Sequence, residues 1–254
     1  MLSVCLHGCN GHMGHVVASV IFAQPDLSVA CGIDTAVPAL DPGFPVFTSF
    51  DDIDVDFDVV IDFSTALAVD RLIEACVRAG KPLVLCTTGL SEAQKASLIQ
   101  ASESIPVFFS ANMSLGVNLL TALAAKAARI LSPAGFDIEV EERHHRRKLD
   151  APSGTALMIA DAMIRSLDDG HYTDTGRMDR REARKDKAIG MSAVRGGTIV
   201  GEHTVIFAGQ DELLELKHTA LSRNLFGVGA VNAARFLVSQ PAGMYDMNDL
   251  LNES

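Results

Sequence analysis

Short, almost wholly apolar runs alternate with segments of helical period over the first 112 residues of the chain. Strands that are apolar throughout must be covered on both faces, and parallel strands need a crossover helix between them. The alternation therefore predicts an α/β fold with a parallel sheet and helices on both of its sides. The expected strands span residues 3–6, 27–33, 58–63, 82–85 and 107–110, and the expected helices span 12–23, 66–79 and 91–102.

The pattern of the chain changes after residue 112. A long amphipathic helix, an edge-like strand, a second helix and three strand-like stretches predict a smaller α+β domain with a mixed or antiparallel sheet. A last helix is expected to return to the first domain, so we expect one domain from 1–112 with 222–254 and another from 113–221. The long helix spans 114–131, the edge-like strand 136–143, the three strand-like stretches 188–220 and the last helix 222–239, while the second helix starts at Ser153. The basic stretch 177–187 is interpreted as a mobile connection or a lid.

The balance of charges limits the classes of partner. The chain carries 21 basic and 32 acidic residues, a net charge of −11, whereas nucleic acids and anionic membranes need a broad basic surface. Its five cysteines are odd in number and several lie in apolar runs, which favours buried, reduced thiols. We expect neither a cleavable leader nor a membrane span. The composition therefore predicts a soluble, cytoplasmic protein that binds neither nucleic acid nor a membrane, and that has no metal site at Cys5 and Cys9.

The first expected strand runs directly into a glycine-rich turn that contains Gly8, Gly11 and Gly14. A dinucleotide needs a tight turn, a backbone without side chains beside the pyrophosphate, and a helix N-terminus aimed at that anion. Glycine turns are common, so the motif alone is weak evidence. Asp34 stands 20 residues beyond Gly14, where a carboxylate can bind ribose hydroxyls; the alternative is that it caps a turn before Pro38. The sequence places a strand, a glycine turn, a helix, a second strand and an acidic residue in the order of a dinucleotide-binding unit, and so predicts a dinucleotide site.

The candidate nucleotide-binding residues follow four of the expected strands. Parallel sheets bind ligands at the carboxyl ends of their strands, and small or polar residues there can contact the nicotinamide ribose and carboxamide. Turn formation alone would also explain the Thr-Thr-Gly run. The candidates are Gly8, Cys9, Asn10, Gly11, His12 and Met13, then Asp34, then Cys86, Thr87 and Thr88, and finally Ser110, Ala111, Asn112 and Met113.

The densest group of chemically active side chains follows the strand at 136–143. His144, His145 and three cations lie within five residues, and a solvated basic loop is the simple alternative. The Ser-Gly-Thr sequence from Ser153 argues against that alternative, because serine is a preferred N-cap and a helix start offers N–H groups that bind anions. With Lys148 holding charge and His144 titrating near neutrality, the segment suits reduction of a carboxylated C=C or C=N substrate.

This segment, E-x-x-H-H-x-x-K-x-D-x-P-S-G-T-A, resembles the signature of the dihydrodipicolinate reductase family, the 4-hydroxy-tetrahydrodipicolinate reductases of lysine biosynthesis. The resemblance spans most of the chain, because further motifs of that family occur in the same order. They are Gly8–Gly14, Asp58–Ser64, Thr87–Gly89, Asn112–Asn118 and Val194–Val205.

The resemblance implies a Rossmann-like nucleotide domain, built from both ends of the chain, and a central domain for substrate binding and oligomerisation, usually in a homotetramer. It implies transfer of hydride from NADH or NADPH to 4-hydroxy-tetrahydrodipicolinate, a small dicarboxylate, with loss of water. His144 matches the proton donor and acceptor of the family, and Lys148 matches its proton donor. His145, Gly154 and Thr155 match the positions that grip the substrate carboxylates.

Two departures from the family bear on the choice of cofactor. Many members carry arginine where this chain has His12, and members often have Glu-Arg where it has Asp34 and Thr35. Both changes remove positive charge from the side that would face the 2′-phosphate of NADP, which modestly favours NADH. Two other interpretations stay open. Another NAD(P)-dependent reductase or dehydrogenase of an imino or oxo acid would share the glycine turn, and a non-catalytic NAD-sensing module would need neither His144 nor Lys148.

Overall fold

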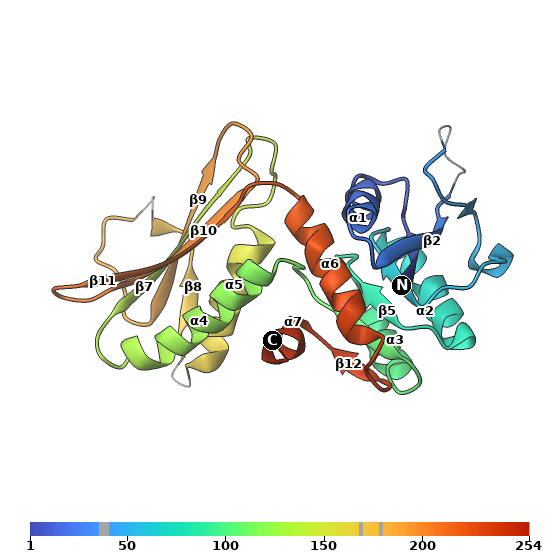
Figure 1. Ribbon diagram of the computed structural model, residues 1–254. Coiled ribbons are helices and arrows are strands. Elements are labelled where there is room, and N and C mark those ends of the chain that lie inside the picture. Colours follow the sequence, from blue (N-terminus) through green and yellow to red (C-terminus); the bar gives the residue numbers. More distant parts are fainter. Residues whose placement is uncertain (36–40, 168–169, 178–179, 254) are drawn as a thin grey trace. The chain divides into compact units, whose positions relative to one another are not determined.

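Figure 1 shows the computed structural model, which describes residues 1–35, 41–167, 170–177 and 180–253. The chain forms two compact units, Met1–Leu115 with Arg223–Ser254 and Gly116–Ser222. The first junction lies at the start of helix α4 (Leu115–Leu131), and the second lies just before helix α6 (Asn224–Leu237).

The first unit is built on a seven-stranded parallel sheet, which confirms the α/β class expected from the apolar runs. Its strands are β1 (Leu2–His7), β2 (Leu27–Ile33), β3 (Val46–Phe47), β4 (Val59–Asp62), β5 (Leu83–Leu85), β6 (Pro106–Phe109) and β12 (Gly243–Tyr245). The order across the sheet is β12-β6-β5-β4-β1-β2-β3. Because the chain moves from β1 to β2 on one side and later to β4 on the other, the carboxyl ends of these strands border a crevice of the kind that binds ligands.

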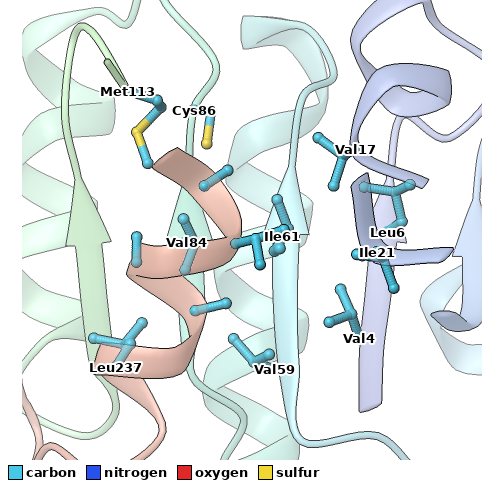
Figure 2. Close-up of a cluster of buried hydrophobic side chains, with 14 of the residues drawn as sticks. Val4, Leu6, Val17, Ile21, Val59, Ile61, Val84, Cys86, Met113 and Leu237 are labelled. Atoms are coloured by element: carbon cyan, nitrogen blue, oxygen red, sulfur yellow. The ribbon is translucent and has the colours of Figure 1, made fainter. Parts of the chain in front are cut away.

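Helices cover both faces of this sheet. α1 (His12–Phe22) and α6 pack on one face, and α2 (Ala66–Ala79) and α3 (Glu92–Ala101) pack on the other, while the short helices η1 (Phe50–Asp52) and α7 (Met247–Asn252) complete the unit. Successive side chains of a strand point to opposite faces. Leu6 and Ile61 therefore join the cluster under α1 and α6 (Figure 2), and Cys5 and Val60 join the cluster under α2 and α3. Each fully buried aliphatic side chain contributes about 1.5–3 kcal/mol.

The second unit is a mixed five-stranded sheet covered on one face by α4 and α5 (Gly154–Ser166). Its strands are β7 (Asp137–His144), β8 (Tyr172–Asp174), β9 (Ala188–Arg195), β10 (Gly201–Ala208) and β11 (Leu213–Ala220), in the order β11-β10-β7-β9-β8. β10 is antiparallel to both of its neighbours, whereas β9 is parallel to both of its own. The mixed sheet expected from the sequence is therefore confirmed. Within the described ranges, no helix has the length and apolarity needed to cross a bilayer.

The edge-like character expected for the strand at 136–143 is wrong. β7 is the central strand, paired with β10 on one side and with β9 on the other. Acidic residues lie along this strand, and arginines from elsewhere in the chain pair with two of them. Arg184 lies 2.8 Å from Asp137 and 3.1 Å from Glu139, and Arg177 also pairs with Glu139. Ion pairs thus tie the described part of 177–187 to β7, while residues 178 and 179 lie outside the described residues.

Candidate active site

Glycines shape the turn between β1 and α1. Gly8 has a φ of 79°, and a Cβ there would lie 2.7 Å from the carbonyl oxygen of Phe63. A Cβ at Gly14 would lie 2.3 Å from the carbonyl oxygen of Gly8, so α1 can start this close to the turn only because both positions are glycine. Gly11 caps α1 and has no side chain that could bond to the first N–H groups, and the first turn contains no acidic residue. The positive end of the helix can therefore receive an anion.

A cleft of about 1170 Å³ opens beside this turn, and its lining includes four predicted cofactor residues, Gly8, Asn10, Gly11 and Asp34. One carboxylate oxygen of Asp34 accepts a hydrogen bond from the backbone N–H of Asn10 at 2.9 Å. The other accepts one from the N–H of Thr35 at 2.7 Å. The carboxylate is thus fixed at the end of β2, where it suits ribose hydroxyls, and the glycine backbone beside it suits a pyrophosphate.

The other predicted cofactor residues do not line this cleft. Cys9 is buried, and burial together with the nearby charge of Asp34 raises the pKa of its thiol to about 11. His12 and Met13 lie in the first turn of α1. The remaining candidates follow β5 and β6 at the carboxyl edge of the sheet: Cys86, Thr87, Thr88, Ser110, Ala111, Asn112 and Met113.

Sequence reasoning missed a buried network at the same edge. Asp62, at the end of β4, is fully buried and accepts a hydrogen bond from Oγ1 of Thr87 at 2.6 Å. Its other oxygen lies 2.6 Å from Nδ1 of His7, which lines the cleft, and accepts the N–H of Ser64 at 3.1 Å. The network therefore joins the ends of β1, β4 and β5. An acid that ends a wholly apolar strand is the sequence signal that could have identified it.

In the second unit, the buried carboxylate of Glu142 contacts His144, Ser153 and Arg195. Oε2 of Glu142 lies 2.6 Å from Nδ1 of His144, which is two residues further along β7 and so on the same face. Oε1 accepts the backbone N–H of Ser153 at 3.0 Å. Arg195, at the end of β9, donates to both oxygens at 2.7 and 2.6 Å. Burial alone would raise the pKa of Glu142, but these hydrogen bonds outweigh it and lower that pKa, so the group is a carboxylate.

His144 presents one ring nitrogen to Glu142 and the other toward Gly201. A carboxylate can only accept a hydrogen bond, so the neutral ring carries its proton on Nδ1 and its lone pair on Nε2. Burial lowers the pKa of His144 against the opposing effect of Glu142, which makes the neutral ring the main form at neutral pH. A Cβ on Gly201 would lie 3.1 Å from Nε2, so the lack of a side chain there leaves room beside this nitrogen. This geometry suits a group that accepts and returns a proton.

The start of α5 is held by the same network. Oγ of Ser153 accepts the backbone N–H of Ala156 at 3.2 Å, which confirms the N-cap expected at this serine. The same oxygen lies 3.2 Å from Nε2 of His203 on β10. The His203 ring packs edge-on against that of His144, with 5.2 Å between the centroids. Burial, aided by repulsion from His144, lowers the pKa of His203 to about 4, so this ring is neutral at neutral pH.

Two of the predicted substrate residues lie at this helix start, and Lys148 lies close to it. Nζ of Lys148 lies 2.9 Å from Oδ2 of Asp150, and hydrogen bonds from Lys148 and from the backbone of Gly154 help to lower the pKa of Asp150. Gly154 and Thr155 are the first two residues of α5. Nδ1 of His145 is buried, and none of the described residues donates to it or accepts from it. A carboxylate, that of Asp150, thus already lies between a lysine ammonium and a helix N-terminus.

Comparison with known proteins agrees with the signature residues. The family models for the N-terminus and the C-terminus of dihydrodipicolinate reductase match residues 2–113 and 116–251. The 4-hydroxy-tetrahydrodipicolinate reductase of Caldanaerobacter subterraneus subsp. tengcongensis is 47% identical over 253 residues, which cover 100% of this chain and 99% of the relative. The reductase of Clostridium tetani is 41% identical over 253 residues, which cover 99% and 98%.

Solved structures show the same fold. The dipicolinate-bound dihydrodipicolinate reductase from Paenisporosarcina sp. TG-14 superposes with a TM-score of 0.82 at 23% identity, over 98% of this chain and 99% of the other. A probable dehydrogenase from Thermotoga maritima reaches a TM-score of 0.64 at 10% identity, over 98% and 92%. The family and the reductase activity expected from the signature are confirmed: the chain is an oxidoreductase of lysine biosynthesis and belongs to the dihydrodipicolinate reductase family.

Proposed function

We propose that this chain reduces 4-hydroxy-tetrahydrodipicolinate to tetrahydrodipicolinate, with hydride from NAD(P)H and loss of water, and that His144 and Lys148 handle the protons of that reaction. The reductase activity rests on full-length similarity to reductases of this substrate. The observation that carries the assignment of the protons is the buried carboxylate of Glu142, which bonds Nδ1 of His144 and so directs Nε2 to proton transfer.

The family uses NAD(P)H, and we infer that the first unit binds it. Gly8, Asn10, Gly11 and Asp34 line the cleft beside the glycine turn and fit the pyrophosphate and ribose of a dinucleotide. When bound, the nicotinamide supplies the hydride. The other expected contacts rest on their place in the glycine turn or after β5 and β6, at the carboxyl edge of the sheet: Cys9, His12, Met13, Cys86, Thr87, Thr88, Ser110, Ala111, Asn112 and Met113.

The substrate is a dianion, and we infer that the second unit grips its carboxylates through His145, Gly154 and Thr155. N–H groups at a helix start and a lysine ammonium are the donors that a carboxylate needs. In this chain the carboxylate of Asp150 already contacts both kinds of donor. The related reductase from Paenisporosarcina binds dipicolinate, which carries two carboxylates.

The net reaction consumes one proton and releases water. Loss of water requires removal of a proton from carbon and delivery of one to the departing hydroxyl, and a neutral His144 with its lone pair on Nε2 can accept and return that proton. Reduction leaves an electron pair on the substrate that must be protonated, and the ammonium of Lys148 can donate to it. Preorganised donors in a site shielded from water stabilise such developing charge by several kcal/mol, roughly 3 for one donor.

Replacement of either proton-handling residue tests the proposal. His144→Ala and Lys148→Ala should each lower kcat by at least about a hundredfold, as loss of a general acid or base does. Lys126→Ala, at an exposed position of α4, is the matched control and should retain the activity of the unmodified chain. Turnover would be followed as NADH oxidation with enzymatically generated substrate. A near-normal rate in either variant would refute the role assigned to that residue.

The cofactor preference has a separate test at Asp34. We expect NADH to be favoured, because a fixed carboxylate repels a 2′-phosphate, although Arg71 lines the same cleft and offers a compensating charge. Asp34→Ala should raise the KM for NADH and leave the KM for NADPH unchanged or lower. Equal effects on both cofactors would show that Asp34 does not bind the ribose.

The family resemblance also implies a homotetramer, and the sequence predicts a cytoplasmic protein without a metal ion. Sedimentation equilibrium of the purified protein should give four times the mass of the chain. Turnover should be unchanged after treatment with a chelator, and inhibition by the chelator would contradict the expectation that no metal takes part.

A further inference from the structure

The buried carboxylate of Glu142 lies between two groups that can each carry a positive charge. One is His144, on the same strand, and the other is Arg195, on the neighbouring strand β9. A buried carboxylate is stable only when it is paired with a charge and fully hydrogen-bonded. Which of the two partners carries the neutralising charge therefore decides whether His144 is an imidazole or an imidazolium.

The contacts of Arg195 make it the fixed partner. Nη1 donates to Oε2 of Glu142 at 2.7 Å and Nη2 donates to Oε1 at 2.6 Å, which is the two-pronged arrangement that a guanidinium favours. The same nitrogens also donate to the carbonyl oxygens of Val194 and Asp150, at 2.8 and 2.7 Å. Arg195 is protonated at every pH at which the protein is folded. Glu142 is therefore neutralised without any proton on His144.

We propose that Arg195 is a positioning residue of the reaction: its guanidinium neutralises Glu142, so that His144 stays a neutral imidazole with Nδ1–H on the carboxylate and its lone pair on Nε2. This inference rests on the proposed role of His144 in proton transfer. Arg195 contacts neither substrate nor cofactor in this scheme. It acts on His144 by neutralising Glu142 and by repelling a proton on the ring.

Burial and the two cations near His144 favour its neutral form. Burial is the largest cause that lowers the pKa of His144, Glu142 opposes it, and Lys148 and Arg195 lower it further. His203 packs against the ring and is itself neutral. The groups that face His144 are Glu142 from β7, Lys148 from the following loop, Arg195 from β9 and His203 from β10, with His218 of β11 acting on His203.

Removal of the arginine charge has a defined consequence. In Arg195→Gln the side chain can still donate a hydrogen bond to Glu142, but the carboxylate keeps an uncompensated negative charge beside His144. Among the described residues that bond to Glu142, only the imidazolium can then carry a positive charge, and the pKa of His144 should rise by about one to two pH units. Arg195→Lys keeps the positive charge but loses the pair of hydrogen bonds that the guanidinium makes to Glu142. The pKa of His144 should therefore stay close to that in the unmodified chain, while kcat falls because Glu142 is held less firmly.

The experiment combines NMR titration of histidine rings with the pH dependence of kcat, on the full-length chain with NADH. The protein has eight histidines, and the signal of His144 is assigned by its loss in His144→Gln. Arg184→Gln is the matched control, because Arg184 also pairs with two carboxylates on β7, Asp137 and Glu139, away from His144. It should leave both the titration and the pH profile unchanged.

Each outcome decides the inference. An upward shift of the His144 titration in Arg195→Gln, with an equal shift in the pH profile and near-normal titration in Arg195→Lys, supports it. An unshifted titration in Arg195→Gln overturns it, even if activity is lost. A shifted titration with an unshifted pH profile refutes the proposed role of His144 itself. Should Arg195→Gln fail to fold, the unmodified chain still gives the answer: ring ¹⁵N shifts that report a proton on Nε2 at neutral pH overturn the inference.

Discussion

The neutral, buried His203 should make the second unit sensitive to mild acid. Its pKa is lowered from 6.5 to about 4, because its ring is buried and lies beside His144. The unfolded chain takes up a proton on this residue as the pH falls below 6.5, and the folded chain does so only near pH 4. Stability is therefore complete above the unfolded pKa and is lost as the pH falls between these two values. At about pH 4.5 the loss amounts to about 2.5 kcal/mol from this residue alone.

His203→Gln isolates this contribution, since glutamine can still hydrogen-bond to Ser153 but does not titrate. Because the chain forms two compact units, the opening free energy of the second unit would be measured by amide hydrogen exchange of β7 and β10 peptides rather than by global unfolding. At about pH 7.5 the variant should be less stable than the unmodified chain, because the substitution removes the ring contact with His144. The difference in opening free energy between the two proteins should narrow by about 2.5 kcal/mol as the pH falls to 4.5. If the two proteins lose stability in parallel over this interval, His203 does not titrate as its burial predicts.

Two glycines give further predictions. Gly8→Ala would force a side chain into a φ of 79° and place its Cβ 2.7 Å from the carbonyl oxygen of Phe63. The substitution should therefore destabilise the first unit by at least about 1–3 kcal/mol, measured by thermal unfolding. It should also weaken NADH binding, measured by fluorescence titration. Gly201→Ala places a methyl group 3.1 Å from Nε2 of His144. It should lower kcat on the order of tenfold or more through displacement of the ring, with the KM for NADH unchanged; an unchanged kcat would show that Nε2 is not the reacting atom.

The fold could be predicted where local pattern and tertiary packing agree. The helix expected at 66–79 has the bounds of α2, because its apolar positions follow one face and Gly80, with a φ of 62°, ends it. The two-residue strand β3 and the three-residue strands β8 and β12 were missed, since so few residues show no period. They pair only because a neighbouring strand already offers an open edge. The central place of β7 was missed for a related reason, because its acidic face is covered by arginines from a distant part of the chain.

The candidate site was predicted in part. His144, Lys148 and the start of α5 could be predicted as parts of one site, because they lie close together along the chain. Arg195 and His203 were not identified as members of the site, although both lie in a family motif. They reach the site through strand pairing, since β9 places Arg195 opposite His144 and β10 places His203 opposite Glu142. Register between strands more than 40 residues apart along the chain cannot be read from local pattern.

That register also explains why the site depends on the sheet as a whole. A strand alternates its side chains between two faces, so a slip of one residue between β7 and β9 would move Arg195 to the face opposite Glu142. The buried carboxylate would then lose its only arginine among the described residues, and His144 would have to carry the neutralising proton. The same carboxylate accepts the backbone N–H of Ser153, so the start of α5, which we propose to bind the substrate carboxylates, also depends on the position of Glu142. The proposed proton transfer and the proposed carboxylate site thus both depend on Glu142, and a change in the pairing of β9 with β7 that displaces this carboxylate should impair both together.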